Sequence, residues 1–139
     1  MANGLMRLFT GIHAKLVKAT GKLGGGTADG SVLVLRHIGA KSGKVRETPL
    51  MFYNEGGARV VIASMGGAPT NPGWYHNLVA NPETVITVDR AQEAVRAREL
   101  VGEERDRVWE RIKATEPRFA GYEKKTDRVM PLIALEPRA

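Results

Sequence analysis

The sequence predicts an α+β fold in which a mostly antiparallel β-barrel, closed or partly open, is flanked by helices. Apolar segments of strand composition recur from residue 31 onward, and most of them are joined by turns of a few residues. Strands joined in this way pair antiparallel, because a parallel pair needs a long crossover. About six such strands within one small domain favour a barrel over a βαβ nucleotide-binding fold.

The length and composition bound the class of protein. We expect residues 1–139 to form one domain, because this is the length of a typical single core. The chain has no cysteine, which excludes thiol catalysis, disulfides and cysteine-ligated metals. We see neither the apolar core of a signal peptide nor an apolar run near the roughly 18 residues of a membrane span. We therefore expect a cytoplasmic protein.

The first element is expected to be an amphipathic helix within residues 1–23. Its apolar side chains recur at helical spacing over residues 4–20, with basic residues elsewhere on the wheel, and the glycines that follow end it. Packing of this helix against the barrel is one interpretation. The other is a helix that lies on an anionic membrane surface, with modest affinity because its cations are few.

The next three elements are expected to form a meander of strands. Ser31–Ile38 is almost continuously apolar, as in a buried strand. After a short turn, Val45–Asn54 is a second strand, and its Pro49 predicts an edge position or a bulge. Two glycines then make a hairpin to the apolar strand Arg59–Ser64.

The second half of the chain is expected to combine helices with a hairpin. A loop rich in glycine and proline leads into a short helix at Trp74–Ala80, which Asn81 and Pro82 end. A hairpin, a charged helix with one apolar side and a last strand follow, at Thr84–Asp89 with Ala94–Val101, Gly102–Thr115 and Val129–Leu135.

The net charge of +6 is concentrated in the first third of the chain. Residues 1–48 hold eight Lys or Arg and two acidic residues, whereas the remainder holds thirteen of each sign. A localised basic region indicates an anionic partner. That partner could be a phosphorylated small molecule, a membrane surface or nucleic acid.

The turn at Gly39–Thr48 is the densest candidate binding site. It gathers backbone N–H groups, hydroxyls and three cations between two apolar strands, which is how proteins hold phosphate groups. It is not a nucleotide-binding P-loop, because only three residues separate Gly39 from Gly43 and Val45 replaces the metal-binding hydroxyl. An ordinary solvated hairpin turn has the same composition.

Two more candidate sites follow the third strand. The glycines of Ser64–Gly73 would let a ligand approach the backbone closely, although a plain surface loop has the same features. Trp74 and Asn77 could grip a flat ring with polar edges, unless Trp74 belongs to the core. The three histidines stand far apart, without acidic residues at ligand spacing, so we expect no metal site.

Tyr122 is the last candidate, in a segment that is expected to be a polar loop. Its hydroxyl could contact a substrate or donate a proton. The alternative is a half-buried tyrosine whose hydroxyl lies in water.

Four sequence blocks, taken together and in this order, resemble the deazaflavin-dependent nitroreductase family, small reductases that use coenzyme F420. The blocks are Gly39–Leu50 (G-x-K-S-G-x-x-R-x-T-P-L), Ala63–Pro69 (A-S-x-G-G-A-P), Pro72–Pro82 (P-x-W-Y-x-N-L-x-A-N-P) and Tyr122–Pro131 (Y-x-x-K-T-D-R-x-x-P). They span most of the chain, and the second and third blocks joined together are highly specific.

The resemblance implies a split β-barrel and an F420H2-dependent oxidoreductase. Such an enzyme transfers a hydride from reduced deazaflavin to an electron-poor acceptor such as a quinone, enone, lactone or nitroaromatic compound. The cofactor carries a phosphodiester and a polyglutamate tail, which would explain the basic first third. An FMN-binding reductase on the same barrel is the alternative, and a basic module that binds polyanions or membranes is a weaker one.

The resemblance also implies the site residues. The phosphate would be held by Lys41, Ser42 and Arg46, and the deazaflavin would be lined by Thr48 and Pro49. The ring or its side chain would lie near Ser64, Met65, Gly66 and Gly67, with Trp74 and Asn77 closing the site from the short helix. Tyr122 or Ser64 would lie beside the open ring face, where substrate binds and a proton is needed.

This chain departs from the family pattern at three positions. Ala40 and Met65 stand where relatives carry a cation, and Phe119 replaces a tyrosine of the members that activate nitroimidazoles. We expect a dehydrogenase that reduces F420 as functional partner and an anionic membrane surface as partner of the N-terminal helix. Nucleic acid is not expected, because the basic third offers only Phe9 for base stacking.

Overall fold

A computed structural model describes residues 26–138 of the chain, so the expected N-terminal helix lies outside the described residues. The strands are β1 (Val32–Ile38), β2 (Val45–Met51), β3 (Tyr53–Glu55), β4 (Ala58–Ile62), β5 (Glu83–Val88), β6 (Ala91–Glu99) and β7 (Leu132–Pro137). The helical elements are the 3-10 turn η1 (Met65–Gly67), α2 (Gly73–Ala80), α3 (Gly102–Thr115) and α4 (Arg118–Lys125). The expected α+β class is confirmed.

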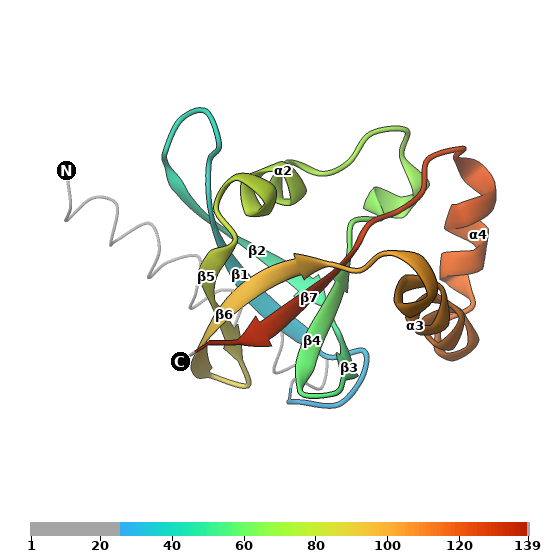
Figure 1. Ribbon diagram of the computed structural model, residues 1–139, viewed down its shortest axis with the longest axis horizontal. Helices are drawn as coiled ribbons and strands as arrows, with labels where there is room; N and C mark the ends of the chain where they lie inside the picture. Colours follow the sequence, from blue (N-terminus) through green and yellow to red (C-terminus); the bar gives the residue numbers. More distant parts are fainter. Residues whose placement is uncertain (1–25, 139) are drawn as a thin grey trace.

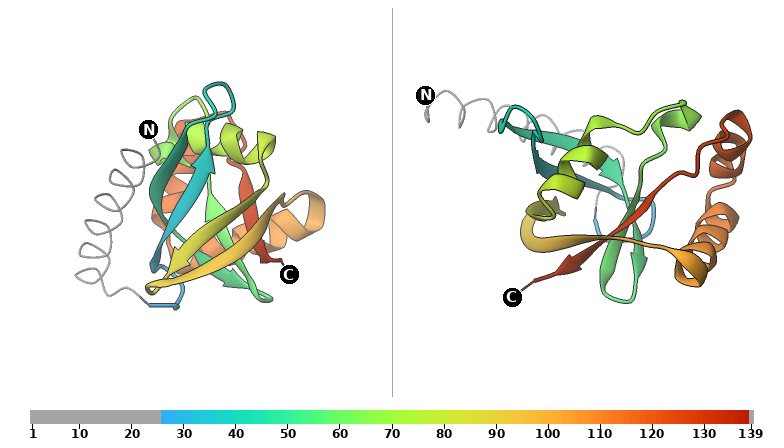
Figure 2. Two further views of the ribbon diagram at one scale, coloured as in Figure 1. Left: turned by 90° about the vertical axis from the view of Figure 1, so that its left-hand side faces the viewer. Right: turned by 45° about the horizontal axis from the view of Figure 1, so that its top comes forward.

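The seven strands form one antiparallel sheet in the order β2-β1-β5-β6-β7-β4-β3. The sheet curls, so that β2 at its end contacts β4 near the other end, and the result is a split barrel (Figures 1 and 2). The edge position predicted from Pro49 is confirmed, because among the described strands β2 pairs only with β1. An edge strand tolerates proline, because the N–H that proline lacks would have no partner strand on that side.

The expected strand Val45–Asn54 is wrong in one respect: the structure has two strands, β2 and β3. At Phe52 the chain still exchanges backbone hydrogen bonds with the segment before β1, and directly afterwards Tyr53 pairs with β4. Phe52 and Tyr53 are both fully buried, in two different apolar clusters. Consecutive strand residues point to opposite faces, so the change of partner lets each ring enter its own core.

The second correction concerns the polar loop expected at Gly121–Arg128, whose first part belongs to helix α4 (Arg118–Lys125). Half of the helix residues are charged and its apolar side chains are few, so helical periodicity was weak in the sequence. Phe119 and Tyr122, three residues apart, share a face of α4 and meet edge to face at 5.7 Å between ring centroids. Phe119 also packs against Trp109 of α3, and Trp109 donates a hydrogen bond to Glu123 (2.6 Å).

Two apolar clusters form the core. The first lies inside the barrel under α2 and includes Trp74 and Leu78, so the alternative in which Trp74 is a core residue applies. The second lies under α3 and α4 and includes Tyr53, Trp109 and Phe119. The remaining elements match their expected ranges, with ends shifted by up to three residues.

Among the described residues, no helix is long and apolar enough to cross a membrane. Helix α2 lies at one end of the barrel, and α3 and α4 lie together at the other end (Figure 1). Strand β2 runs from the region of α2 toward that of α4, and this strand carries the site.

Candidate active site

An open groove lies between the β1–β2 turn and α2, with a volume of ≈ 560 Å³. Its lining residues are Gly39, Ala40, Lys41, Ser42, Arg46, Gly73, His76 and Asn77. The turn holds its own shape: Gly39 N–H donates to the Lys44 carbonyl (2.8 Å), and Lys44 N–H donates to Ser42 Oγ (3.2 Å). A Cβ at Gly39 would collide with that Ser42 hydroxyl, so a larger residue there would force the serine side chain away from its hydrogen bond with Lys44 N–H.

The groove is positively charged and its cations are free to bind an anion. Within residues 26–138, neither Lys41 nor Arg46 lies within ion-pair distance of a carboxylate. Arg98 and Arg111 differ, since each is ion-paired to two carboxylates. Gly73 at the N-terminus of α2 lines the same groove, and the positive end of the helix dipole adds to the field. The site therefore suits a multiply charged anion.

A chain of hydrogen bonds joins the turn, both strands and α2. Ala40 N–H donates to Asn77 Oδ1 (2.9 Å), Asn77 Nδ2 lies 2.9 Å from His37 Nδ1, and His37 Nε2 lies 2.8 Å from Thr48 Oγ1. His37 is buried, and burial lowers its pKa, with the positive charge of Arg46 as the second cause. A neutral imidazole therefore belongs to this chain of contacts.

Sequence reasoning missed His37, because it weighed the histidines only as metal ligands. A signal was present: His37 is a polar residue at the end of an otherwise apolar strand, directly before the phosphate-type turn.

A second pocket, of ≈ 200 Å³, lies between β2, the loop after β4 and α4. Its lining is Pro49, Leu50, Met51, Ile62, Ser64, Gly66, Arg118, Phe119 and Tyr122. The surface is mostly apolar, with the hydroxyls of Ser64 and Tyr122 and the guanidinium of Arg118 as polar groups. The structure thus brings Pro49, Ser64, Gly66 and Tyr122 together from distant parts of the sequence.

Strand β2 connects the groove with the pocket. Arg46 lines the groove, and Pro49, Leu50 and Met51 line the pocket, so Thr48 lies between the two along the strand. Side chains alternate along a strand, so residues from both faces of this edge strand reach the pocket. Predicted residues of the first block therefore follow β2 from the groove to the pocket.

Arg128 holds the glycine-rich loop in place and was also missed as a functional residue. Its guanidinium donates to the carbonyls of Ala63 (2.8 Å), Ser64 (2.7 Å) and Ala68 (3.0 Å), and to Asn71 Oδ1 (2.6 Å). A planar fork of donors can satisfy several carbonyls at once, which lysine cannot do. Arg128 therefore shapes the loop that presents Ser64 and Gly66.

Three predicted residues have surroundings other than the groove and the pocket. Trp74 is a residue of α2 that is 7% exposed, and its side chain packs in the core and anchors the helix there. Met65 is 53% exposed and has a positive φ of 44°. Gly67 is buried against the backbone of α4, so its missing side chain serves helix packing.

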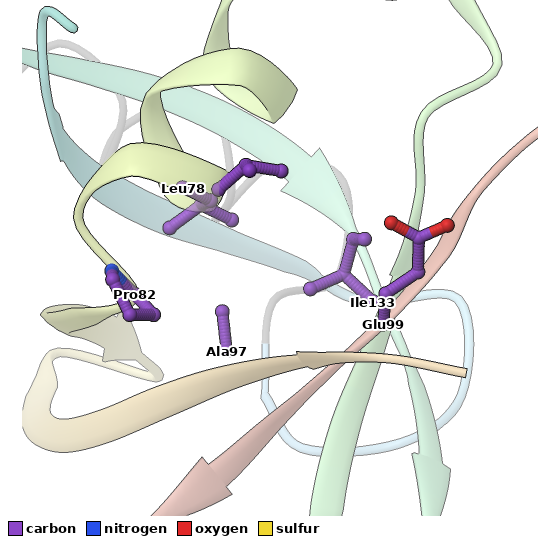
Figure 3. A pocket seen from close by; sticks show the side chains of 6 residues that line it. Leu78, Pro82, Ala97, Glu99 and Ile133 are labelled. Carbon is purple, nitrogen blue, oxygen red and sulfur yellow. The ribbon is translucent and has the colours of Figure 1, made fainter. Parts of the chain in front are cut away.

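A further small hollow, of ≈ 100 Å³, lies on another side of α2 and contains none of the predicted residues. Figure 3 shows Leu78, Pro82, Ala97 and Ile133 around it, with the Glu99 carboxylate close by. Glu99 accepts a hydrogen bond from the Tyr75 hydroxyl (2.6 Å), which raises the pKa of Tyr75 to about 12. Tyr75 is therefore tied to β6 by this bond.

A family model described as F420H(2)-dependent quinone reductase matches residues 6–137. The chain belongs to this family. An F420H(2)-dependent quinone reductase of Mycobacterium tuberculosis is 36% identical over 109 residues, covering 76% of this chain and 73% of the relative. A second, putative quinone reductase of the same organism is 37% identical over 106 residues, covering 76% of this chain and 89% of the relative.

Solved structures agree with membership of the F420H(2)-dependent quinone reductase family. The structure of an F420-H2 dependent reductase (FDR-A) is 40% identical with a TM-score of 0.68, and the match covers 76% of this chain and 93% of that one. The haem storage protein HutZ of Vibrio cholerae shares the fold alone, at 15% identity and a TM-score of 0.61 over 78% of this chain and 82% of its own.

Family membership confirms the resemblance carried by the four sequence blocks. The chain is an F420H2-dependent oxidoreductase with the split-barrel fold, and coenzyme F420 is its cofactor. FMN remains only a secondary alternative.

The close contact at Gly67 yields a stability prediction. A Cβ there would lie 2.8 Å from the Tyr122 carbonyl oxygen and 3.2 Å from Tyr122 Cα, and its φ is +85°. Backbone strain and the clash together predict that Gly67→Ala loses about 2–4 kcal/mol of unfolding free energy, measured by urea denaturation.

Gly66→Ala is the matched control. Its φ is also positive (+64°), but a Cβ there meets nothing within 4 Å. It should lose only the strain of about 1 kcal/mol. Equal losses for the two variants would contradict the packing role of Gly67.

Proposed function

We propose that the chain transfers a hydride from reduced F420 to a quinone, with the cofactor lying along β2. The observation that carries this proposal is the placement of two different cavities along one strand. Strand β2 runs from a cationic groove, lined by Arg46, to a mostly apolar pocket, lined by Pro49, Leu50 and Met51. A cofactor with an anionic tail and a flat ring matches a site with those two ends.

The anionic part of the cofactor would be held in the groove. Lys41 and Arg46 have no competing carboxylate within the described residues, so a phosphodiester would not have to displace one. Ser42 and the first turn of α2 would add polar contacts. Asn77, already bonded to Ala40 N–H, would keep the turn at a fixed distance from the helix.

The ring would lie between groove and pocket, against Thr48, Pro49 and the loop at Ser64–Gly67. Arg128 holds that loop in shape by donating to the loop carbonyls, and the Trp74 side chain anchors α2 in the core. These contacts would orient the ring without supplying chemistry of their own. One side of the ring would then face the pocket near Tyr122.

The acceptor would bind in the apolar pocket, where its walls exclude water. Reduced F420, when bound, supplies a hydride, that is two electrons and one hydrogen. Reduction of a quinone to a quinol then needs one proton at oxygen, which Tyr122, Ser64 or water can donate. Arg118 would stabilise negative charge on that oxygen. Its guanidinium is a cation in a mostly apolar lining, and it is also ion-paired with Glu116 (3.6 Å), with which the oxygen would compete.

Phe119 bears on which acceptors fit. It is 5% exposed and packs edge to face on Tyr122, so it fixes the tyrosine ring and offers no hydroxyl of its own. We infer that quinones, enones and lactones are better acceptors here than nitroimidazoles. Each turnover also consumes one reduced cofactor, so a dehydrogenase that reduces F420 must recharge it.

Turnover is the direct test of the proposed function. Reduced F420 with menadione should give oxidised F420 and menadiol in equal amounts, measured by absorbance under anaerobic conditions. Reduced FMN in place of F420 is the comparison. Cofactor binding without turnover across quinones, enones, lactones and nitroaromatics would refute the enzymatic proposal, and preference for FMN would refute its cofactor.

Lys41→Ala should weaken F420 binding by about tenfold, as expected when one charge-assisted hydrogen bond is lost. Lys44→Ala is the matched control, because Lys44 belongs to the same turn and is exposed but does not line the groove. Titration followed by calorimetry gives both affinities. Equal affinities for wild type and Lys41→Ala would remove the phosphate site from the turn.

We further propose that the enzyme is cytoplasmic and associates with anionic membranes through residues 4–20, which would bring it to apolar quinones. Full-length protein should sediment with anionic liposomes, and less so at high salt, whereas a variant without those residues should stay in the supernatant. Equal sedimentation of the two proteins would contradict the membrane role of the helix.

A further inference from the structure

The backbone N–H of Ala40 fixes the direction of every hydrogen bond in the chain that contains His37. An N–H can only donate, so the Asn77 atom that it contacts at 2.9 Å is the amide oxygen. The Asn77 amino group must then face His37 Nδ1, at 2.9 Å, and donate to it. A nitrogen that accepts a hydrogen bond carries no proton, so His37 Nδ1 is the unprotonated nitrogen.

The same logic continues to Thr48. A neutral His37 with a bare Nδ1 has its proton on Nε2, and Nε2 donates to Thr48 Oγ1 at 2.8 Å. Thr48 thereby receives a hydrogen bond and keeps its own hydroxyl proton for another acceptor. Thr48 lies on β2 between Arg46, which lines the groove, and the residues Pro49–Met51, which line the pocket.

We propose that neutral His37 is a positioning residue that fastens the phosphate-binding turn to α2 and orients the Thr48 hydroxyl as a donor to the bound cofactor. It acts through Asn77 on one side and Thr48 on the other, and it touches neither cofactor nor substrate. The role assigned to Thr48 rests on the proposed F420 function. The fastening of the turn does not, since it is a property of the free protein.

Protonation of His37 breaks this arrangement. A charged imidazole has two donors and no acceptor, so Nδ1–H would face the Asn77 amino group. Asn77 would have to rotate its amide, and the Ala40 N–H would lose its acceptor. Acid should therefore release the turn from α2 and reduce affinity for the cofactor.

The charges around His37 favour the neutral ring. Arg46 of β2 is the charge that acts on His37, beside the larger effect of burial. The turn also carries Lys41 and Lys44, and α2 contributes the neutral Asn77 and the exposed His76. Glu47 and Arg36 neighbour this site along β2 and β1, but strand alternation directs their side chains to the opposite face. The strand β5 reaches this region with Thr84, whose hydroxyl donates to the Arg36 carbonyl.

The expected pH dependence of cofactor affinity is opposite to the one that charge attraction alone would give. A histidine that gained a charge beside an anionic ligand would bind it more tightly in acid. A histidine that holds the turn would bind it less tightly. The pKa of His37 is lowered by burial and by Arg46, so the neutral form holds above about pH 6.5 and is lost as the pH falls through the folded-state pKa.

The first measurement uses the free protein. Long-range 1H–15N spectra of histidine-labelled wild type distinguish the two neutral tautomers and the charged ring, and the His37 signals are identified by their absence in His37→Gln. At pH 7.5 we expect Nε2–H with bare Nδ1. On acidification, the Ala40 amide signal should shift and its hydrogen exchange should accelerate with the His37 titration. The other tautomer, or an Ala40 amide indifferent to that titration, would overturn the proposal.

The second measurement is F420 affinity between pH 5 and pH 7.5 for wild type and His37→Gln. Glutamine keeps a neutral donor for Thr48 and gains no proton in this range. The titration of the ligand itself is common to both proteins, so the ratio of the two Kd values isolates His37. We expect the wild-type Kd to rise about tenfold relative to that of His37→Gln on acidification, as for one lost hydrogen bond.

Two variants complete the test. His37→Leu, which bonds to neither neighbour, should bind F420 about tenfold more weakly than His37→Gln at pH 7.5. His76→Gln should keep the acid loss of affinity, which excludes His76 as its source. A wild-type Kd that falls in acid relative to that of His37→Gln would overturn the proposal. Absence of F420 binding at every pH would refute the proposed function and the role of Thr48. The pH dependence of the Ala40 amide signal in the free protein would still test whether His37 fastens the turn to α2.

Discussion

The burial of two consecutive aromatic residues, Phe52 and Tyr53, in two different cores is the constraint on which this structure depends. Consecutive strand residues point to opposite faces, and the chain changes its partner between the two rings: Phe52 still bonds to the segment before β1, and Tyr53 pairs with β4. The change of partner ends β2, keeps it at the edge of the sheet and directs the chain under α3 and α4. As a result β2 spans the distance between the two cores, and the groove and the pocket lie at its two ends.

The site is therefore a property of one strand and its supports. The turn before β2 supplies cations that have no carboxylate partner within residues 26–138, and the apolar end of β2 meets the loop and helix that carry Ser64 and Tyr122. Arg128 and His37 support the site from outside the two cavities. Arg128 donates hydrogen bonds to the carbonyls of the glycine-rich loop, and His37 joins β2 to α2 through Asn77. An enzyme whose cofactor carries the reactive group needs this kind of rigid placement more than it needs nucleophiles.

The sequence predicted what depends on local pattern. The turn, the edge strand with Pro49, helix α3 and the four family blocks follow from neighbouring residues, and the structure contains all of them. Helix α4 was missed because Phe119 and Tyr122 are few apolar residues among charges, and their packing on Trp109 is set by tertiary contacts. His37 and Arg128 were missed for a related reason. Their roles rest on partners 40 and 60–65 residues away in the chain, and no local pattern encodes that separation.

The contact between Gly67 and the backbone of α4 has a consequence for variation in the pocket. The loop touches the Tyr122 carbonyl and Cα, which every residue type possesses, so this contact does not depend on the side chain at position 122. Phe119 differs, because its buried ring packs on Trp109 and Tyr53 and holds α4 to the core. A change at position 122 would therefore alter the pocket while Gly67 and Phe119 keep the helix in place.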